Sequence, residues 1–228
     1  MVFVTNFSAL TRSEAEARLA DIGIDASGRV ITSAMAAGSL LEAGERVLVC
    51  AGEGVWEAVA ERGAIGLDPG DGVGVHAGID AVVVGFHRTF DFDRLSAAAR
   101  AVQQGARLIA TNADPTYPTP DGLLAGNGAL LAAVATAGRA NDRVTVAGKP
   151  YPTVAALVHA HLGTEAGDRR HIVVGDLPAT DGRLAVELGF RFGLVLSGVT
   201  SADAAGQADP VPDVLAADLS EMVASLLG

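Results

Sequence analysis

Short apolar runs alternate with amphipathic stretches along almost the whole chain. The apolar runs predict strands over residues 2–4, 47–50, 81–84, 108–110, 144–147, 172–174 and 194–196. The stretches between them predict helices over residues 13–22, 33–42, 55–62, 95–105, 128–137, 153–161, 182–188 and 215–227. Strands that are apolar on both faces and alternate with helices are typical of a mostly parallel sheet covered by helices. We therefore expect a doubly wound α/β fold.

Composition and charge narrow the class of protein. Half of the 228 residues are hydrophobic, 19% are charged, and the formal net charge is −11. The negative charge argues against nucleic acid or an anionic membrane surface as a partner. No apolar run approaches the roughly 18 residues of a membrane span. The single cysteine, Cys50, excludes an internal disulfide and fits a reducing compartment, so we expect a soluble cytoplasmic protein.

Polar residues follow the first predicted strand, at the edge where open parallel sheets bind their ligands. Thr5 and Asn6 could supply a hydroxyl, an amide and main-chain N–H groups to a phosphate. The alternative is an ordinary strand-to-helix turn with capping residues.

A second strand end carries the single lysine of the sequence. Lysine and arginine together number sixteen, yet only Lys149, between Gly148 and Pro150, is a lysine. Lysine offers a compact ammonium on a flexible stem, whereas arginine offers a wide planar fork. We interpret Lys149 as a residue that neutralises an anionic substrate, and the alternative is a surface lysine retained by chance.

A third strand end carries two carboxylates. Asp176 follows the apolar run 172–174, and Asp181 lies five residues further on. Mg²⁺ takes one or two protein carboxylates and fills its other positions with water and phosphate oxygens. The alternative is a helix cap at Asp176 and a solvated charge at Asp181. Together the three strand ends carry a hydroxyl, a lysine and a metal-binding acid, which is typical of phosphoryl transfer.

These motifs, in this order, make the chain similar to the haloacid dehalogenase-like phosphatases of subfamily IIA, the NagD-like and p-nitrophenylphosphatase-like enzymes that include glycerol-3-phosphate phosphatases. The matching segments are Val2 to Ser8 (second motif), 31–34 (entry to the cap), 109–114, 118–119, 122–124 and 126–128 (cap signature), Gly148-Lys149-Pro150 (third motif), Gly175-Asp176 to Asp181 (fourth motif), 196–200 and 212–227. Phe7 departs from the pattern, because relatives usually carry Asn or another small polar residue there.

The resemblance implies a domain organisation and an activity. It implies a Rossmann-like core of residues 1–45 and 143–228 with an inserted α/β cap at about residues 46–142, which selects the leaving group. Relatives often pair through their caps, so a homodimer is implied as well. The implied reaction is Mg²⁺-dependent hydrolysis of a small phosphomonoester, of the sugar- or glycerol-phosphate type, through an aspartyl-phosphate.

The resemblance also assigns roles to single residues. It assigns phosphate binding to Thr5, Asn6 and Lys149; catalysis to Lys149 and Thr5; Mg²⁺ ligation to Asp176, with Asp181 in support; and substrate contact in the cap to Asn112, Asp114 and Asn127.

The first motif of the family, Asp-x-Asp-Gly, is not found in these 228 residues. It carries the nucleophile and the general acid/base, and its strand lies between those of the second and fourth motifs. Asp91-Phe92-Asp93 and Asp71-Gly72 are partial copies, and we interpret both as cap residues. We expect the opening residues of a phosphatase to be missing from this sequence. The alternative is an inert pseudophosphatase that binds a phosphometabolite and Mg²⁺.

Overall fold

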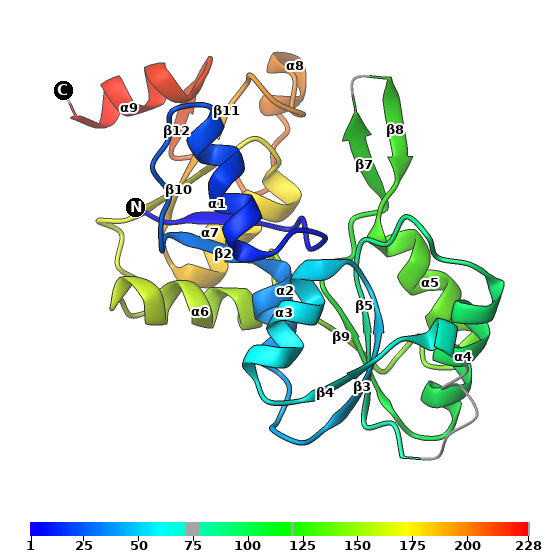
Figure 1. The fold of residues 1–228 in the computed structure, drawn as a ribbon. Helices are drawn as coiled ribbons and strands as arrows, with labels where there is room; N and C mark the ends of the chain where they lie inside the picture. Colours follow the sequence, from blue (N-terminus) through cyan, green and yellow to red (C-terminus); the bar gives the residue numbers. More distant parts are fainter. Residues whose placement is uncertain (72–77, 120, 228) are drawn as a thin grey trace. The chain divides into compact units, whose positions relative to one another are not determined.

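The structure, a computed structural model, describes residues 1–71, 78–119 and 121–227. These residues form two compact units, which we call unit 1 (Met1–Gly148) and unit 2 (Lys149–Gly228). Each unit contains a parallel sheet with helices packed on it (Figure 1).

Unit 1 alternates strands and helices from its first residues. Its strands are β1 (Phe3–Thr5), β2 (Val30–Thr32), β3 (Arg46–Cys50), β4 (Ile65–Leu67), β5 (Ala81–Val84), β6 (Arg107–Ala110), β7 (Thr116–Thr119), β8 (Gly122–Ala125) and β9 (Val144–Val146). Its helices are α1 (Arg12–Asp21), α2 (Ser33–Gly38), α3 (Glu53–Glu61), the 3₁₀ turn η1 (Pro69–Asp71), α4 (Phe92–Gln103) and α5 (Asn127–Gly138).

The main sheet of unit 1 is parallel throughout, with the strand order β4-β3-β5-β6-β9. Alternate side chains of its central strands, such as Leu48, Val82 and Leu108, pack in one cluster with buried residues of α4 and α5. Helices α2 and α3 lie on the other side of the sheet (Figure 1). Burial on both faces explains why these strands read as continuous apolar runs in the sequence.

The loop after β1 is tied to the carboxyl ends of the main sheet. Ser8 Oγ accepts hydrogen bonds from Phe86 N (3.0 Å) and Thr111 Oγ1 (3.1 Å), beyond β5 and β6. The carbonyl of Asn6 accepts from Asn112 Nδ2 (2.7 Å). These bonds explain why residues 1–45 form one compact unit with the following hundred residues.

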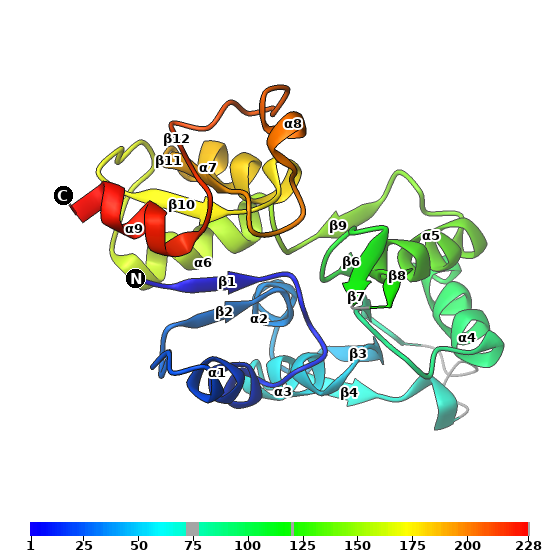
Figure 2. The same ribbon diagram turned by 90° about the horizontal axis from the view of Figure 1, so that it is seen from above.

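Unit 2 contains three strands and four α-helices among its described residues. They are α6 (Pro152–Leu162), β10 (Ile172–Gly175), a π-helical turn (Pro178–Gly182), α7 (Arg183–Leu188), β11 (Arg191–Val195), α8 (Ala202–Ala205), β12 (Val214–Ala216) and α9 (Leu219–Leu227). The sheet is parallel, in the order β10-β11-β12. Phe192 and Leu194 pack with Ala185 of α7, whereas Val195 and Ala216 pack with Met222 of α9, so the sheet is covered on both faces (Figure 2).

Strands β1 and β10, like the other terminal strands of these sheets, have a hydrogen-bonded neighbour on one side only. Within the described residues β1 pairs with β2 alone, and β10 pairs with β11 alone. Both strands are only half-buried, although the residues of β2 and most of β11 are buried. Their outer edges therefore carry main-chain groups for which these strand pairs supply no partner.

The structure confirms the predicted α/β fold with parallel sheets, and it corrects several boundaries. The helix predicted over 215–227 is wrong at its start, because Val214–Ala216 pairs with β11 as strand β12 before α9 begins at Leu219. The helix predicted over 33–42 ends at Gly38. Strands β2 and β4 and the antiparallel hairpin β7–β8 were not predicted.

The two compact units do not coincide with the predicted core (1–45 and 143–228) and cap (46–142). The division into units 1 and 2 follows from contacts within this chain and does not test the core and cap assignment. That assignment stays a prediction. No helix in the described ranges is both long and apolar enough to cross a membrane.

Cys50 provides a test of the packing in unit 1. Burial raises the pKa of its thiol to about 12, and the side chain is fully buried. Because the thiolate is the reactive form, we expect iodoacetamide at pH 8 to leave Cys50 unmodified in the native protein. Mass spectrometry after unfolding in guanidinium should show complete alkylation, and rapid alkylation of the native protein would contradict this packing.

Candidate active site

Lys149 forms an ion pair at the start of unit 2. Its Nζ lies 2.6 Å from Oδ1 of Asp181, and the two side chains are only 15% and 8% exposed. The lysine stands just before α6, which begins at Pro152, and the Lys149–Pro150 peptide bond is cis. The structure therefore pairs two of the predicted site residues, and the Lys149 side chain is mostly buried.

The second oxygen of Asp181 organises the loop that follows β10. Asp181 Oδ2 accepts hydrogen bonds from the main-chain N–H groups of Asp176 and Leu177, each at 3.1 Å. A Cβ on Gly175 would collide with this carboxylate, so the absence of a side chain there admits Asp181. Asp181 thus connects the lysine to the loop that carries Asp176.

Asp176 is oriented by the loop after β11. Its Oδ2 accepts from Val199 N (2.7 Å), and its carbonyl accepts from Thr200 Oγ1 (2.6 Å). A Cβ on Gly198 would overlap the Asp176 carboxylate. The sequence did not indicate that Gly198 and Thr200 position Asp176, because residues 196–200 were interpreted only as a segment that matches the family.

The donor set around Asp176 fits a magnesium ion that keeps most of its water. No residue that the structure describes donates a hydrogen bond to Asp176 Oδ1. In the described parts of the chain, no three His, Cys, Asp or Glu side chains gather as a metal cluster. A single carboxylate oxygen suits Mg²⁺, which commonly takes one or two carboxylates and completes its octahedron with water and phosphate.

Thr5 ends strand β1 of unit 1, and Asn6 begins the loop that follows, which several hydrogen bonds hold in place. Thr5 Oγ1 accepts from Phe7 N (3.1 Å), and Asn6 Nδ2 donates to Asp114 Oδ2 (3.0 Å). Ser33 Oγ donates to the Asn6 carbonyl at 2.7 Å. The structure thus brings Asn6 together with Asp114, one of the predicted cap residues.

The two predicted cap asparagines are buried and bind main-chain carbonyls. Asn127, 2% exposed, donates through Nδ2 to the carbonyls of Asn112 (2.7 Å) and Val84 (3.2 Å). Asn112, 5% exposed, donates to the Asn6 carbonyl and accepts from Asp114 N. Both side chains hold the loop geometry around Asn6, and their direct contact with a substrate stays a prediction.

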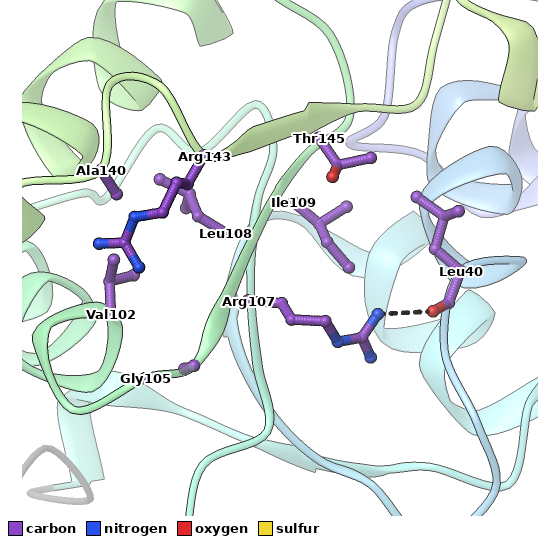
Figure 3. Close-up of a pocket in the computed structure, with 10 residues that line it drawn as sticks. Leu40, Val102, Gly105, Arg107, Leu108, Ile109, Ala140, Arg143 and Thr145 are labelled. Atoms are coloured by element: carbon purple, nitrogen blue, oxygen red, sulfur yellow. Dashed lines mark hydrogen bonds between the residues drawn. The ribbon is translucent and has the colours of Figure 1, made fainter.

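A cavity of about 260 Å³ in unit 1 contains none of the predicted site residues. It lies where β6 and β9 begin, lined among others by Arg107, Arg143 and Ile109 (Figure 3). Arg107 is already engaged there, since it donates to the carbonyl of Leu40 (3.0 Å) and pairs with Glu45 (2.6 Å). This cavity is at the amino ends of the strands, opposite the edge that carries the loop of Asn6.

Comparisons with known proteins identify the family. Residues 1–65 match the sequence model of the haloacid dehalogenase-like hydrolases, and residues 146–222 match that of the HAD-hydrolase-like proteins. Chronophin of Bos taurus is 33% identical over 99% of this chain and 81% of its own length. The chain belongs to the haloacid dehalogenase-like hydrolases, subfamily IIA.

One relative is more similar in sequence but considerably longer. The D-glycerol 3-phosphate phosphatase of Mycobacterium tuberculosis is 40% identical over 97% of this chain, which spans 62% of that relative. A crystal structure of the mycobacterial glycerol phosphate phosphatase in complex with magnesium gives a TM-score of 0.85 at 36% identity, over 96% of this chain and 66% of that one. The p-nitrophenyl phosphatase of Archaeoglobus fulgidus gives 0.85 at 28% identity, over 99% and 85%.

Asp91 and Asp71, from the two partial copies of the family's first motif, have structural roles in the part of the chain that the structure describes. Asp91 is the N-cap of α4, where Oδ1 accepts from Arg94 N (2.8 Å) and Oδ2 pairs with the guanidinium (2.7 Å). The hydrogen bond from Arg94 N is the main cause that lowers the pKa of Asp91. Asp71 ends the turn η1, and Gly72 lies outside the described residues. Asp91 therefore has a capping role in this hydrolase fold.

Proposed function

We propose that these 228 residues are the larger part of a phosphatase that hydrolyses a small phosphomonoester, of the sugar- or glycerol-phosphate type, through an aspartyl-phosphate. The buried pair of Lys149 and Asp181, joined to Asp176 by main-chain hydrogen bonds, carries the proposal. It unites a point positive charge and a metal-binding carboxylate, the two elements that phosphoryl transfer requires. The activities named for the mycobacterial and staphylococcal relatives, glycerol 3-phosphate phosphatase and acid sugar phosphatase, support this substrate class.

Lys149 would stabilise negative charge on the phosphoryl oxygens. Its ammonium is held at 2.6 Å by Asp181, so it needs no large rearrangement when charge develops. Charges that are fixed in advance stabilise a transition state more than mobile ones do. Asp181 would act indirectly, by holding both the lysine and the Asp176 loop in place.

Asp176 would hold Mg²⁺ through Oδ1, since Val199 N already occupies Oδ2. The bound ion would supply a positive charge that neutralises phosphoryl oxygens. Thr5 and Asn6 would bind the phosphate through hydroxyl and N–H groups, in a loop that Asn112, Asp114 and Asn127 hold in shape. Homodimer formation through the cap stays a prediction.

The nucleophilic aspartate belongs, in this proposal, to a segment outside the 228 residues. The chain contains no Asp-x-Asp-Gly, and Asp91 has the capping role described above.

The 228-residue chain should show no Mg²⁺-dependent turnover of p-nitrophenyl phosphate, because the carboxylate that would be phosphorylated is absent. A version that carries an Asp-x-Asp-Gly segment ahead of Met1 should turn it over with Mg²⁺. The measurement is p-nitrophenol release by both proteins, with and without EDTA.

The variant Asp176→Asn separates the possible outcomes of this assay. Turnover by the 228-residue chain that disappears in Asp176→Asn would reveal a nucleophile within the chain and contradict the proposal. An inactive extended version that still binds inorganic phosphate and Mg²⁺ would favour the inert pseudophosphatase instead.

A further inference from the structure

Three aromatic rings meet beside the loop that begins at Asn6, directly after Thr5 of β1. The ring centroids of Phe7 and Phe86 are 5.2 Å apart, those of Phe7 and Tyr117 are 5.4 Å apart, and those of Phe86 and Tyr117 are 5.5 Å apart. Every pair is within the range of favourable ring contacts. We call these three residues the aromatic cluster. The whole chain has only seven Phe, two Tyr and one Trp, so the cluster concentrates a scarce side-chain type.

Each ring comes from a different segment, and each segment is tied to the loop of Asn6. Phe7 follows Asn6 directly and donates its N–H to Thr5 Oγ1. Phe86 donates its N–H to Ser8 Oγ at 3.0 Å. Tyr117 is three residues beyond Asp114, which accepts from Asn6 Nδ2. The cluster is therefore positioned by the same contacts that position the proposed phosphate-binding residues.

The cluster is only half-buried, and its apolar surface continues onto the hairpin β7–β8. Leu124 is the cross-strand partner of Tyr117, so both side chains are on one face of the hairpin. Leu124 is 46% exposed. Beside the polar loop of Asn6, the chain thus presents a largely apolar surface of three rings and a leucine, with the Tyr117 hydroxyl and the Arg18 guanidinium, which lies 5.9 Å from the Phe7 ring centroid, as its polar groups.

This surface disfavours a leaving group made only of hydroxyl groups. Phe7, Phe86 and Leu124 offer no side-chain hydrogen-bonding group, so a hydroxyl placed against them would lose water without compensation. A ring with an apolar face would instead stack on the cluster.

We propose that the aromatic cluster binds the leaving group of the substrate, and that this leaving group carries a ring with an apolar face instead of an open-chain polyol. The inference rests on the proposed phosphatase function and chooses within its substrate class. Phe7 is the specificity-determining residue in this proposal, since it joins the cluster to Asn6.

The test compares three phosphorus ligands on the complete 228-residue chain in the presence of Mg²⁺: phenylphosphonate, glycerol 3-phosphate and inorganic phosphate. Titration calorimetry should give a dissociation constant for phenylphosphonate about tenfold below that for glycerol 3-phosphate, the scale of a ring contact plus apolar burial. Phe7→Asn should remove most of this advantage and leave the affinity for inorganic phosphate unchanged.

Phe92→Asn is the matched control, because the ring of Phe92 is 78% exposed on α4. It should preserve all three affinities. Native protection of Cys50 from iodoacetamide would show that each variant is folded, and Tyr117→Leu replaces Phe7→Asn if that variant unfolds.

The remaining outcomes overturn either the role of the aromatic cluster or the proposed phosphate site on which it rests. Equal affinities for phenylphosphonate and glycerol 3-phosphate would overturn the role of the cluster, as would an equal loss for all three ligands in Phe7→Asn. Failure of all three ligands to bind the unmodified chain would overturn the proposed phosphate site, and the inference with it.

Discussion

Lys149→Arg should lower kcat by a factor of roughly 10²–10³ in a version of the chain that carries the nucleophile segment, the scale of losing one fixed charge contact at a reacting centre. The guanidinium is wider than the ammonium and spreads its charge over a plane. It cannot occupy the position that Nζ holds 2.6 Å from Asp181 Oδ1 and also present a point charge to the phosphoryl group. The measurement is kcat with p-nitrophenyl phosphate, beside the thermal midpoint.

Arg183→Lys is the matched control for this substitution. Arg183 also lies in unit 2 and forms an ion pair with Asp209, but the two side chains are 57% and 81% exposed. Exchanging cations at such a site usually changes stability by no more than about 0.5 kcal/mol. If Lys149→Arg retained a near-normal kcat, as we expect of Arg183→Lys, the lone lysine would have no special role.

Gly198→Ala should weaken Mg²⁺ binding by about 10–100-fold, the usual effect of disturbing a group that orients a metal ligand. The added methyl group would overlap the Asp176 carboxylate, which must then move away from Val199 N. This binding can be measured on the 228-residue chain, without turnover, from the chemical-shift change of the Val199 amide during a Mg²⁺ titration.

Gly206→Ala tests whether any alanine in this unit has the same effect. A Cβ on Gly206 would have its nearest neighbour at 3.8 Å, the carbonyl oxygen of Asp203, which is an ordinary contact. The Mg²⁺ titration of this variant should match that of the unmodified chain. Equal Mg²⁺ affinities in Gly198→Ala and the unmodified chain would show that the loop after β11 does not position the metal ligand.

The sequence was sufficient to predict the strand–helix alternation and to single out candidate site residues, but not the partners of those residues. Lys149, Asp176 and Asp181 were identified because each stands near a strand end, where ligand-binding residues are expected. The ion pair of Lys149 with Asp181, and the hydrogen bonds from the Asp176 loop to Asp181, depend on the absence of a side chain at Gly175. This dependence is visible only in the structure, where the Asp181 carboxylate packs against Gly175. A glycine in a sequence does not indicate which side chain will occupy the space beside it.

The three residues that the resemblance assigned to the cap show a second limitation of the sequence. Asn112, Asp114 and Asn127 were singled out by resemblance, and all three are connected to the loop of Asn6 directly or through one another. The burial of both asparagines was not predictable, because an asparagine that binds substrate and one that binds a main-chain carbonyl look alike in a sequence. The aromatic cluster was equally hidden, since its members are separated by 79 and 31 positions in the chain.

The outer edges of β1 and β10 have a consequence for handling the protein. An unpaired edge of an apolar strand is a template for strand addition by another molecule, and the main chain provides the hydrogen bonds. Phe3 and Val4 on β1, and Ile172 to Val174 on β10, provide such apolar strands. Copies of the 228-residue polypeptide would therefore aggregate at high concentration through their edges, despite the mutual repulsion that a net charge of −11 provides.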